Sequence, residues 1–441
     1  MESYQMELRD TMNELQMKLY QMELRDIMKA LQLEDTCLAA IEPNWDKSAA
    51  SFPAAIPEFL TPAGYRRNFE YTGLAASLLP VLDDISAKIV NNQELLHLAW
   101  HCYQSQYVYP NPSFAKWPWF ENILGENSTV FYLLILIAAL PLTIKKYQAM
   151  GIPEEYAAAI CSRARGYYDT YKAGYNRHGI NPGQLYWARL YTDAVIFRVG
   201  RFEYWPRQLD GQYPFEAYKN DKTGKVLALR TGGLNYNHEG YCLGSGEDQS
   251  MIAFTGKYEK TDEYVIGTPI NPEGTAAAFN VKLDLREWTQ VLGSDDIVLD
   301  IHIPEGGKMT LDLCEQSFKD ALKFFEKYFP QTKISAFGCC SWIFYPLYEK
   351  TMPESNLAAF MRELYLVPWP SGCADGFYFI FGRDYDKQVT YPRDTSIRRA
   401  MLDELRTGGC LRSGGMFFLA EHIELFGQKP YRTMLKVEDF N

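Results

Sequence analysis

Residues 300–310 read Asp300-Ile-His302-Ile-Pro304-Glu-Gly306-Gly307-Lys308-Met-Thr310 and are followed by DLCEQSFKDALKFFEKYFP over 312–330. The β-branched and apolar residues of 297–303 predict a strand. The following segment predicts a helix over 312–329, because acidic residues suited to capping begin it and apolar residues then recur on one face: Cys314, Phe318, Ala321, Leu322, Phe325 and Phe329. A strand, a Gly-Gly turn and an amphipathic helix in this order are typical of a mixed α/β domain.

The Gly-Gly turn is a candidate anion site. Gly306 and Gly307 let the backbone approach a ligand closely, and the dipole of the helix that follows favours negative charge. The loop fits neither GxGxxG nor GxxxxGK[ST], so an ordinary turn before a helix is the competing interpretation.

The residues after Gly183 alternate between strand and helix patterns. Further predicted strands cover 194–204, 224–229, 264–267, 276–285, 334–340, 377–381 and 416–419, and further predicted helices cover 355–365 and 395–405. Before residue 150 strand signals are nearly absent. We therefore predict an α+β protein with an all-helical domain over 1–150 and a mixed α/β domain over 151–441.

The helical half carries three notable patterns. YQMELRD occurs at 4–10 and again at 20–26, which predicts a duplicated helical extension over 1–30 or, alternatively, a coiled-coil arm. Phe114, Trp117, Trp119 and Phe120 lie in a proline-rich loop that forms either a hydrophobic plug or a ligand surface. A further helix is predicted over 153–175.

Charge and composition exclude several classes of protein. Acidic residues outnumber basic ones by 55 to 44, and the net charge of −11 excludes general attraction to nucleic acid or to an anionic membrane. The longest apolar run, 130–142, is shorter than the roughly 20 residues that span a bilayer, so it predicts a buried helix. The charged, Gln-rich start lacks the pattern of a secretory signal, and we expect a cytoplasmic protein.

Cysteine and histidine spacing gives no metal or disulfide pattern. The nine cysteines are dispersed, with only Cys339 and Cys340 adjacent, so reduced and mostly buried thiols are expected. His97 and His101 have the i, i+4 spacing of metal ligands but lack an HExxH motif, and no metal site is predicted.

The segments HIPEGG, DLCEQSFKDALKFFEKYFP, AFGCCSWIFYP, ESNLAAFMRELY and DTSIRRAMLDEL, followed by RSGGMFFL, resemble a bacterial acyltransferase-domain family with a helical N-terminal domain and a GNAT-like C-terminal domain. The resemblance covers about 31–431 and is strongest after Ile301. It implies a mixed sheet whose fourth strand leads to a pyrophosphate-binding loop and a helix, with acyl-CoA as co-substrate. The implied CoA-binding residues are Ile303, Gly306, Gly307 and Lys308, although the loop reads PEGGKM where the family usually has Gln or Arg followed by xxGxG or xxGxA.

The implied reaction is acyl transfer from a CoA thioester to an amine-type small-molecule acceptor by direct attack, without a metal. This chemistry needs a base for the amine and an acid for the departing thiolate. His302 is the first candidate base and Glu203 an alternative that acts through water. Tyr345 or Tyr348 lies where the resemblance places a phenol that protonates the thiolate. The ordinary alternatives are a core histidine, a solvated glutamate and chance placement among 31 tyrosines.

Three other interpretations stay open at this stage. Cys339, Cys340 or Ser341 is a candidate nucleophile, although no GxSxG elbow surrounds Ser341 and adjacent cysteines usually pack as small apolar residues. A non-catalytic small-molecule-binding protein accounts for the unusual loop. The 65 aromatic residues are also compatible with a carbohydrate-active protein whose rings stack on sugars. The oligomeric state, the acceptor and the acyl-chain length are not specified by the sequence.

Overall fold

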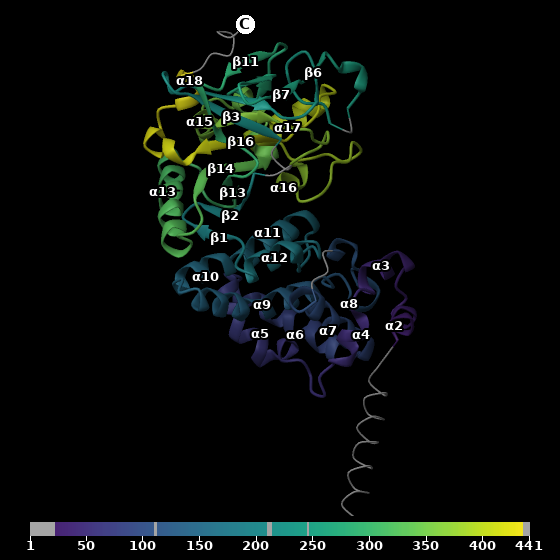
Figure 1. Ribbon diagram of the computed structural model, residues 1–441. Helices are drawn as coiled ribbons and strands as arrows, with labels where there is room; N and C mark the ends of the chain where they lie inside the picture. Colours follow the sequence, from purple (N-terminus) through teal and green to yellow (C-terminus); the bar gives the residue numbers. More distant parts are fainter. Residues whose placement is uncertain (1–22, 110–112, 210–213, 245–246, 435–441) are drawn as a thin grey trace, which may run out of the picture. The chain divides into compact units, whose positions relative to one another are not determined.

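The computed structural model describes residues 23–109, 113–209, 214–244 and 247–434 (Figure 1). The chain forms two compact units, Met1–Val195 and Ile196–Asn441. Most of the duplicated extension lies outside the described residues. Its described part includes α2 (Leu24–Ala30), which buries Leu24, Ile27 and Met28.

The first unit is helical, as predicted, and its boundary lies after Val195 rather than near residue 150. The reason is packing, because three helices beyond residue 150 lie against α9 (Val130–Ala149). The helices are α3 (Leu38–Ile41), α4 (Trp45–Ala50), α5 (Pro62–Phe69), α6 (Leu79–Val90), α7 (Gln93–Tyr107), α8 (Glu121–Leu124), α9, α10 (Glu154–Cys161), α11 (Arg163–Tyr175) and α12 (Gln184–Thr192).

Helix α9 is the core of this unit. By length and composition it could cross a membrane, but 67% of its apolar window is buried inside the protein, as expected of a core helix. The aromatic loop before α9 is the predicted plug, since Phe114, Trp117 and Phe120 are all buried and the Trp117 indole donates to the Ala40 carbonyl at 3.1 Å. The helix predicted over 153–175 is broken at Ser162 into α10 and α11.

The second unit is built around a six-stranded mixed sheet. The strands lie in the order β1-β2-β13-β14-β16-β15, and only β13 and β14 are parallel neighbours. This confirms the predicted order of strand, turn and helix, because β13 leads through the Gly-Gly loop into α13. The bounds are β1 (Phe197–Val199), β2 (Phe202–Gln208), β13 (Ile297–His302), α13 (Leu311–Tyr328), β14 (Ile334–Ser341), β15 (Tyr365–Pro368) and β16 (Gly414–Leu419).

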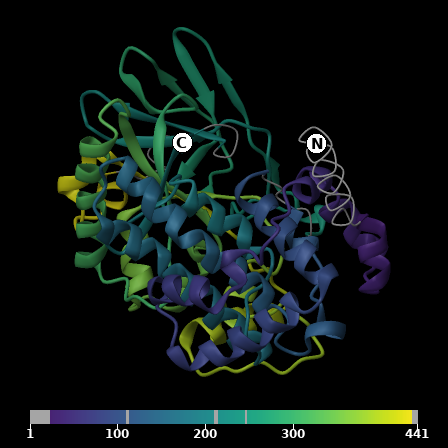
Figure 2. The ribbon, with the colours of Figure 1, turned by 90° about the horizontal axis from the view of Figure 1, so that it is seen from below.

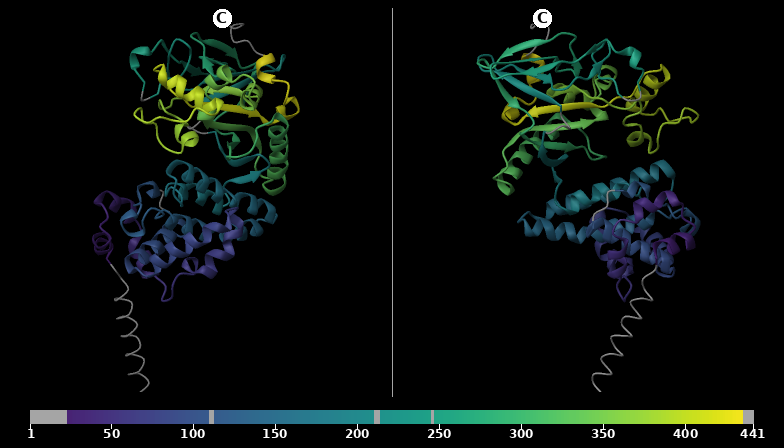
Figure 3. Two further views of the ribbon diagram at one scale, coloured as in Figure 1. Left: turned by 180° about the vertical axis from the view of Figure 1, so that it is seen from behind. Right: turned by 45° about the vertical axis from the view of Figure 1, so that its right-hand side comes forward.

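Helix α13 covers one face of this sheet, and both views in Figure 3 show it beside the strands. Its apolar side is buried, and the Phe318 ring stacks on Phe337 of β14 with 3.9 Å between ring centroids. Phe325 is also fully buried, whereas Leu322 is only half-buried and Phe324 takes a core position that the helical pattern did not predict. The predicted facing of the helix is therefore right to within one residue.

A long segment, 209–296, is inserted between the neighbouring strands β2 and β13. Its strands are teal in Figure 2, and the Leu209 amide donates to the Asp296 carbonyl at 2.9 Å, so the segment starts and ends at one place. It forms a five-stranded sheet β10-β9-β4-β3-β12 and two small ones, β11-β8-β7 and β5-β6. The bounds are β3 (Phe215–Asn220), β4 (Val226–Arg230), β5 (Asn235–Tyr236), β6 (Phe254–Thr255), β7 (Tyr258–Lys260), β8 (Tyr264–Gly267), β9 (Pro269–Asn271), β10 (Thr275–Ala276), β11 (Val281–Asp284) and β12 (Trp288–Leu292).

Two sequence predictions for the C-terminal part are wrong. Residues 377–381 form a short helix, α16 (Phe377–Phe381), rather than a strand, because glycines with positive φ at 376 and 382 confine the segment to a single turn. Cys373 and Cys410 form a disulfide, although reduced thiols were expected. The other helices are α14 (Leu347–Thr351), α15 (Asn356–Glu363), α17 (Ser396–Arg406) and α18 (Pro430–Met434).

Candidate functional site

The parallel strands β13 and β14 separate toward their C-terminal ends. Their pairing stops at Asp300 and Gly338, whereas β13 goes on pairing with β2 as far as His302, and β14 with β16 as far as Ser341. Beyond Asp300 the two strands therefore no longer hydrogen-bond each other, which leaves main-chain N–H and C=O groups for another partner. We call this feature the β13–β14 opening. Across it, the Cys339 thiol donates to the Ile301 carbonyl at 3.0 Å.

Two predicted site residues face each other next to this opening. Glu203 of β2 is the direct antiparallel partner of His302 of β13. Directly opposed residues of an antiparallel pair project from the same face, with their Cβ atoms about 4.5–5.5 Å apart. Glu203 is fully buried, and the His302 ring lies flat against Trp205 with 6.4 Å between ring centroids. A carboxylate beside an imidazole can fix its tautomer and stabilise its charged form.

An arginine that no sequence pattern indicated forms hydrogen bonds with the loop after β13. Arg201, in the turn between β1 and β2, donates to the carbonyls of Pro304 at 2.9 Å, Gly307 at 3.1 Å and Lys308 at 3.1 Å. These three hydrogen bonds turn the carbonyls of the loop toward the guanidinium and stabilise this conformation of the loop.

The two glycines of the loop act differently. Gly306 has a φ of +82°, which other residues adopt only with strain. Gly307 does not have a positive φ; its constraint is that an added Cβ would lie 3.0 Å from Arg201 Nε. The amides of Gly306 and Lys308 donate to no backbone carbonyl in the described chain. Ile303, Gly306, Gly307 and Lys308, which were predicted to bind the cofactor, are therefore brought together in one loop next to the opening, and their role stays a prediction.

The first turn of α13 is partly occupied by its own side chain. The Thr310 hydroxyl, and then the amides of Leu313 and Asp312, hydrogen-bond the Asp312 carboxylate and lower its pKa. An anion at this junction therefore has to use the loop amides rather than the helix terminus alone.

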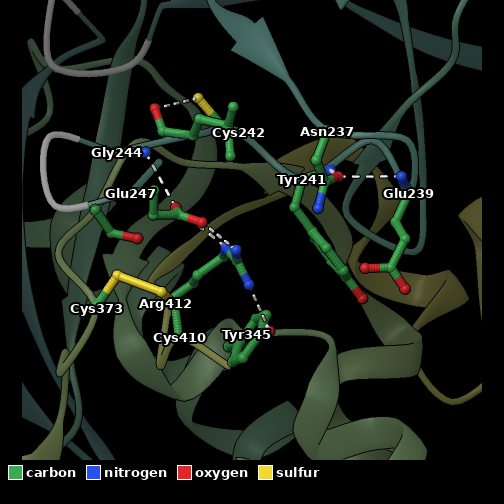
Figure 4. A network of polar contacts seen from close by, with 12 residues as sticks. Asn237, Glu239, Tyr241, Cys242, Gly244, Glu247, Tyr345, Cys373, Cys410 and Arg412 are labelled. Atoms are coloured by element: carbon green, nitrogen blue, oxygen red, sulfur yellow. Dashed lines mark hydrogen bonds and ion pairs between the residues drawn. A yellow bond between two sulfur atoms is a disulfide. The ribbon is translucent and has the colours of Figure 1, made fainter. Parts of the chain in front are cut away.

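Tyr345, the third predicted catalytic residue, belongs to a separate buried network (Figure 4). Its hydroxyl accepts a hydrogen bond from Arg412 Nη1 at 3.0 Å, and Arg412 forms a buried ion pair with Glu247. Burial raises the pKa of the Tyr345 phenol above its usual range, so the hydroxyl keeps its proton. The disulfide joins the loop before α16 to Cys410, two residues before Arg412.

A groove of about 710 Å³ lies between α14, the turn after it and α17. Glu404 lines this groove, and burial raises the pKa of its carboxyl. Glu404 also contacts the Tyr345 hydroxyl, so the groove borders the Tyr345–Arg412 network. Ligand sites of about 300–1,000 Å³ are common, but none of the predicted catalytic or cofactor-binding residues lines this groove.

The structure disfavours a cysteine nucleophile. Burial raises the pKa of both the Cys339 and the Cys340 thiol well above the usual range, so they are protonated and inert near neutral pH. No group of three metal-ligating side chains occurs among the described residues. His101, of the predicted i, i+4 pair, contacts Ser48 Oγ and the Ile41 carbonyl through its ring nitrogens.

Some site residues could not be found from sequence alone. Arg201 is one of many arginines in the chain, and its role depends on a loop a hundred residues away. Arg412 and Glu247 are even more remote, at 165 residues apart in the sequence. The sequence carries a signal only for Glu247 and Arg412 as a pair. Opposite charges in otherwise apolar or glycine-rich segments often form an ion pair when they are buried.

Comparisons with known proteins place the geometry in context. The family model described as GNAT-like C-terminal domain matches residues 196–418, which is half of the chain and nearly the whole second unit up to β16. No curated protein matches the sequence.

Solved structures of similar fold cover 90% of the chain. An acyltransferase in complex with decanoyl-CoA and teicoplanin has a TM-score of 0.59 and 16% identity, with 90% of this chain and 100% of that chain covered. An acyltransferase with CoA and 10C-teicoplanin has a TM-score of 0.59 and 17% identity over 90% and 100% of the chains. An acyltransferase with decanoyl-CoA has a TM-score of 0.56 and 15% identity over 90% and 99%. At this level of identity the likeness concerns the fold.

Proposed function

Because the chain belongs to the family of proteins with a GNAT-like C-terminal domain, we propose that it is an acyltransferase that moves an acyl group from a CoA thioester to an amine-type acceptor. The observation that carries this proposal is the β13–β14 opening, which lies beside a histidine–glutamate pair and leads to a glycine loop whose Gly306 and Lys308 amides donate to no backbone carbonyl among the described residues. The acyl-CoA complexes of the similar structures support the same class of donor.

In this proposal the backbone beyond Asp300 receives the thioester. Main-chain amides that no longer pair with β14 are donors for a carbonyl oxygen on which negative charge develops. The amides of Gly306 and Lys308 bind the pyrophosphate, and Arg201 holds them in place by engaging the carbonyls of the same loop.

The acceptor amine attacks the acyl carbon directly. His302 accepts a proton from the amine, and the buried Glu203 carboxylate on the neighbouring strand orients the imidazole and stabilises its charged form. The new carbon–nitrogen bond forms as the carbon–sulfur bond breaks, and the thiolate leaves with a proton. Tyr345 remains our prediction for the group that supplies this proton, with Arg412 holding its hydroxyl.

Titration calorimetry with acetyl-CoA and decanoyl-CoA tests the donor. We expect binding of both, with the longer chain binding more tightly where the opening accommodates it. Release of free thiol in the presence of an amine panel, with acylated product identified by mass spectrometry, tests the transfer. Absence of binding at millimolar concentration of both thioesters would contradict the proposal and favour a binding protein that keeps the fold without the chemistry.

A further inference from the structure

Arg230, the last residue of β4 in the inserted segment, is fully buried and incompletely hydrogen-bonded. Its Nη1 atom lies 3.4 Å from the Pro368 carbonyl. Its Nε and Nη2 atoms have no hydrogen-bond partner among the described residues. A buried guanidinium with two unused donors is costly, because each lost hydrogen bond to water goes unreplaced.

No carboxylate compensates this charge in the described part of the chain. The ionisable groups that act on Arg230 are Tyr236, Cys242 and Cys340, and burial raises the pKa of each, so they keep their protons and carry no charge near neutral pH. Burial lowers the pKa of the guanidinium itself. The Trp369 ring lies 5.7 Å from it and supplies the only cation–π contact of Arg230 among the described residues. By contrast, the buried Arg412 has Glu247 as its partner. The surroundings of Arg230 therefore suit an anion that the chain itself does not provide.

The position of Arg230 connects it with the β13–β14 opening. A Cβ added to Gly415 would lie 3.4 Å from the Trp369 ring and 3.5 Å from the Cys340 sulfur, so both groups converge on one point of β16. Cys340 is on the part of β14 that no longer pairs with β13. The guanidinium, which makes its cation–π contact with Trp369, thus lies near the end of the strand that borders the opening.

Arg230 is also on the same side of the sheet as the histidine–glutamate pair. Phe337 stacks on α13, so Cys340, three residues later, projects from the opposite face. The Tyr204 hydroxyl hydrogen-bonds Ser317 of α13, so the Tyr204 side chain projects toward α13. Glu203, the preceding residue of β2, therefore projects away from α13, and so does His302, which is paired with Glu203. Cys340, Glu203 and His302 therefore share the face that the inserted segment covers with Arg230.

We propose that Arg230 binds a carboxylate group of the acceptor, so that the acceptor is an amine that also carries a carboxylate. The Nε and Nη2 hydrogens lie on one edge of the guanidinium and point in parallel, which matches the two oxygens of a carboxylate in a bidentate pair. The identification of the bound molecule as the acyl acceptor rests on the proposed function, whereas the anion site itself does not depend on it.

Thermal unfolding in sodium benzoate, with sodium chloride of equal ionic strength as the reference, tests the anion site. Benzoate at saturating concentration should raise the wild-type Tm by about 2 °C or more. Arg230→Met removes the two parallel N–H donors and should abolish this rise. Arg230→Lys should greatly reduce it, because an ammonium has no parallel pair of donors. Arg286→Met is the matched control, since Arg286 is exposed and already paired with Asp284, and its response should equal that of the wild type.

A parallel titration with CoA separates the possible sources of the anion. CoA should raise the Tm of the wild type and of Arg230→Met equally, because its phosphates bind at the glycine loop. Loss of the CoA effect in Arg230→Met would show that Arg230 binds a phosphate of the acyl donor rather than the acceptor, and would overturn the proposal. The proposal also fails if benzoate leaves the wild-type Tm unchanged or raises it equally in Arg230→Met. If benzoate acts through Arg230 but CoA does not bind, the anion site stands and the acyltransferase proposal fails.

Discussion

Glu203 and His302 are direct partners across the antiparallel strands β2 and β13, although nearly a hundred residues separate them in the sequence. Taken singly, each residue has an unremarkable explanation, as a solvated glutamate or a core histidine. The structure rules out the first, because Glu203 is fully buried. A buried carboxylate opposite an imidazole, beside the β13–β14 opening, is compatible with the base role that we propose for His302.

Replacing His302 and Glu203 tests whether they act as a unit. We expect His302→Gln to lower kcat by about 100-fold or more, with little change in the dissociation constant for acyl-CoA. Glu203→Gln should lower kcat less. The double variant should be no slower than His302→Gln, because a carboxylate that acts through the imidazole has no role without it. Rate losses that multiply in the double variant would show that the two residues act independently.

Replacing Gly307 tests the loop. In Gly307→Val the new side chain meets Arg201 Nε and should displace the guanidinium from the loop carbonyls. We expect affinity for CoA to fall about tenfold, equivalent to about 1.4 kcal/mol, in titration calorimetry. Gly232→Val is the matched control, because an added Cβ there meets nothing within 4 Å. Unchanged CoA binding in Gly307→Val would remove this loop from the site.

Helix α13 offers a matched pair of core substitutions. Phe325 is fully buried against Phe197 and Phe329, so Phe325→Ala should cost about 3–5 kcal/mol in urea unfolding. Leu322→Ala should cost clearly less, because Leu322 is half-buried. Equal losses at the two positions would mean that the helix is rotated about its axis relative to the structure.

The disulfide predicts a dependence on redox conditions. Cys373 and Cys410 are 37 residues apart, and closing a loop of that length stabilises a fold by about 4 kcal/mol in the chain-entropy model. Cys373→Ser should lower the free energy of unfolding, measured in urea, by about that amount, and adding a dithiol reductant should do the same to the wild type only. Alkylation of all nine cysteines in unreduced, denatured protein would contradict the bond.

The helical unit should lose stability in mild acid through His101. Burial lowers the pKa of His101 to about 4 from its usual 6.5, so the folded state binds this proton less readily than the unfolded state does. Stability is therefore at its full value above pH 6.5 and falls as the pH drops from about 6.5 to about 4, by about 3 kcal/mol in all. His101→Gln should flatten this part of the pH profile, measured by urea unfolding of the full chain.

The sequence predicts the parts of this protein that local patterns control. Helix α13 follows from the spacing of its apolar residues, and the strand and glycine turn before it from residue type, because these properties act within one turn or one strand. The same reasoning fails at residues 377–381, where a run of aromatic residues favours a strand and the flanking glycines override that preference.

The site is less predictable because its contacts are distant in the chain. His302, Glu203 and Gly307 were candidates on chemistry, but nothing local indicates that the first two share a face or that Arg201 supports the third. The Cys373–Cys410 disulfide could not be predicted for the same reason, because spacing in the sequence does not show which cysteines lie close together in the fold. Arg230 looks like an ordinary end of a strand until its burial is known.

The hydrogen bond between Leu209 and Asp296 closes the inserted segment into a loop with touching ends. Chain elements of this kind can be exchanged between relatives without disturbing the host, because the host requires only that the two ends arrive together. His302 and the glycine loop belong to the host sheet, whereas Arg230 belongs to the insert. Under the function proposed above, replacing this one segment would change which acceptor is acylated and would leave His302 and the glycine loop in place.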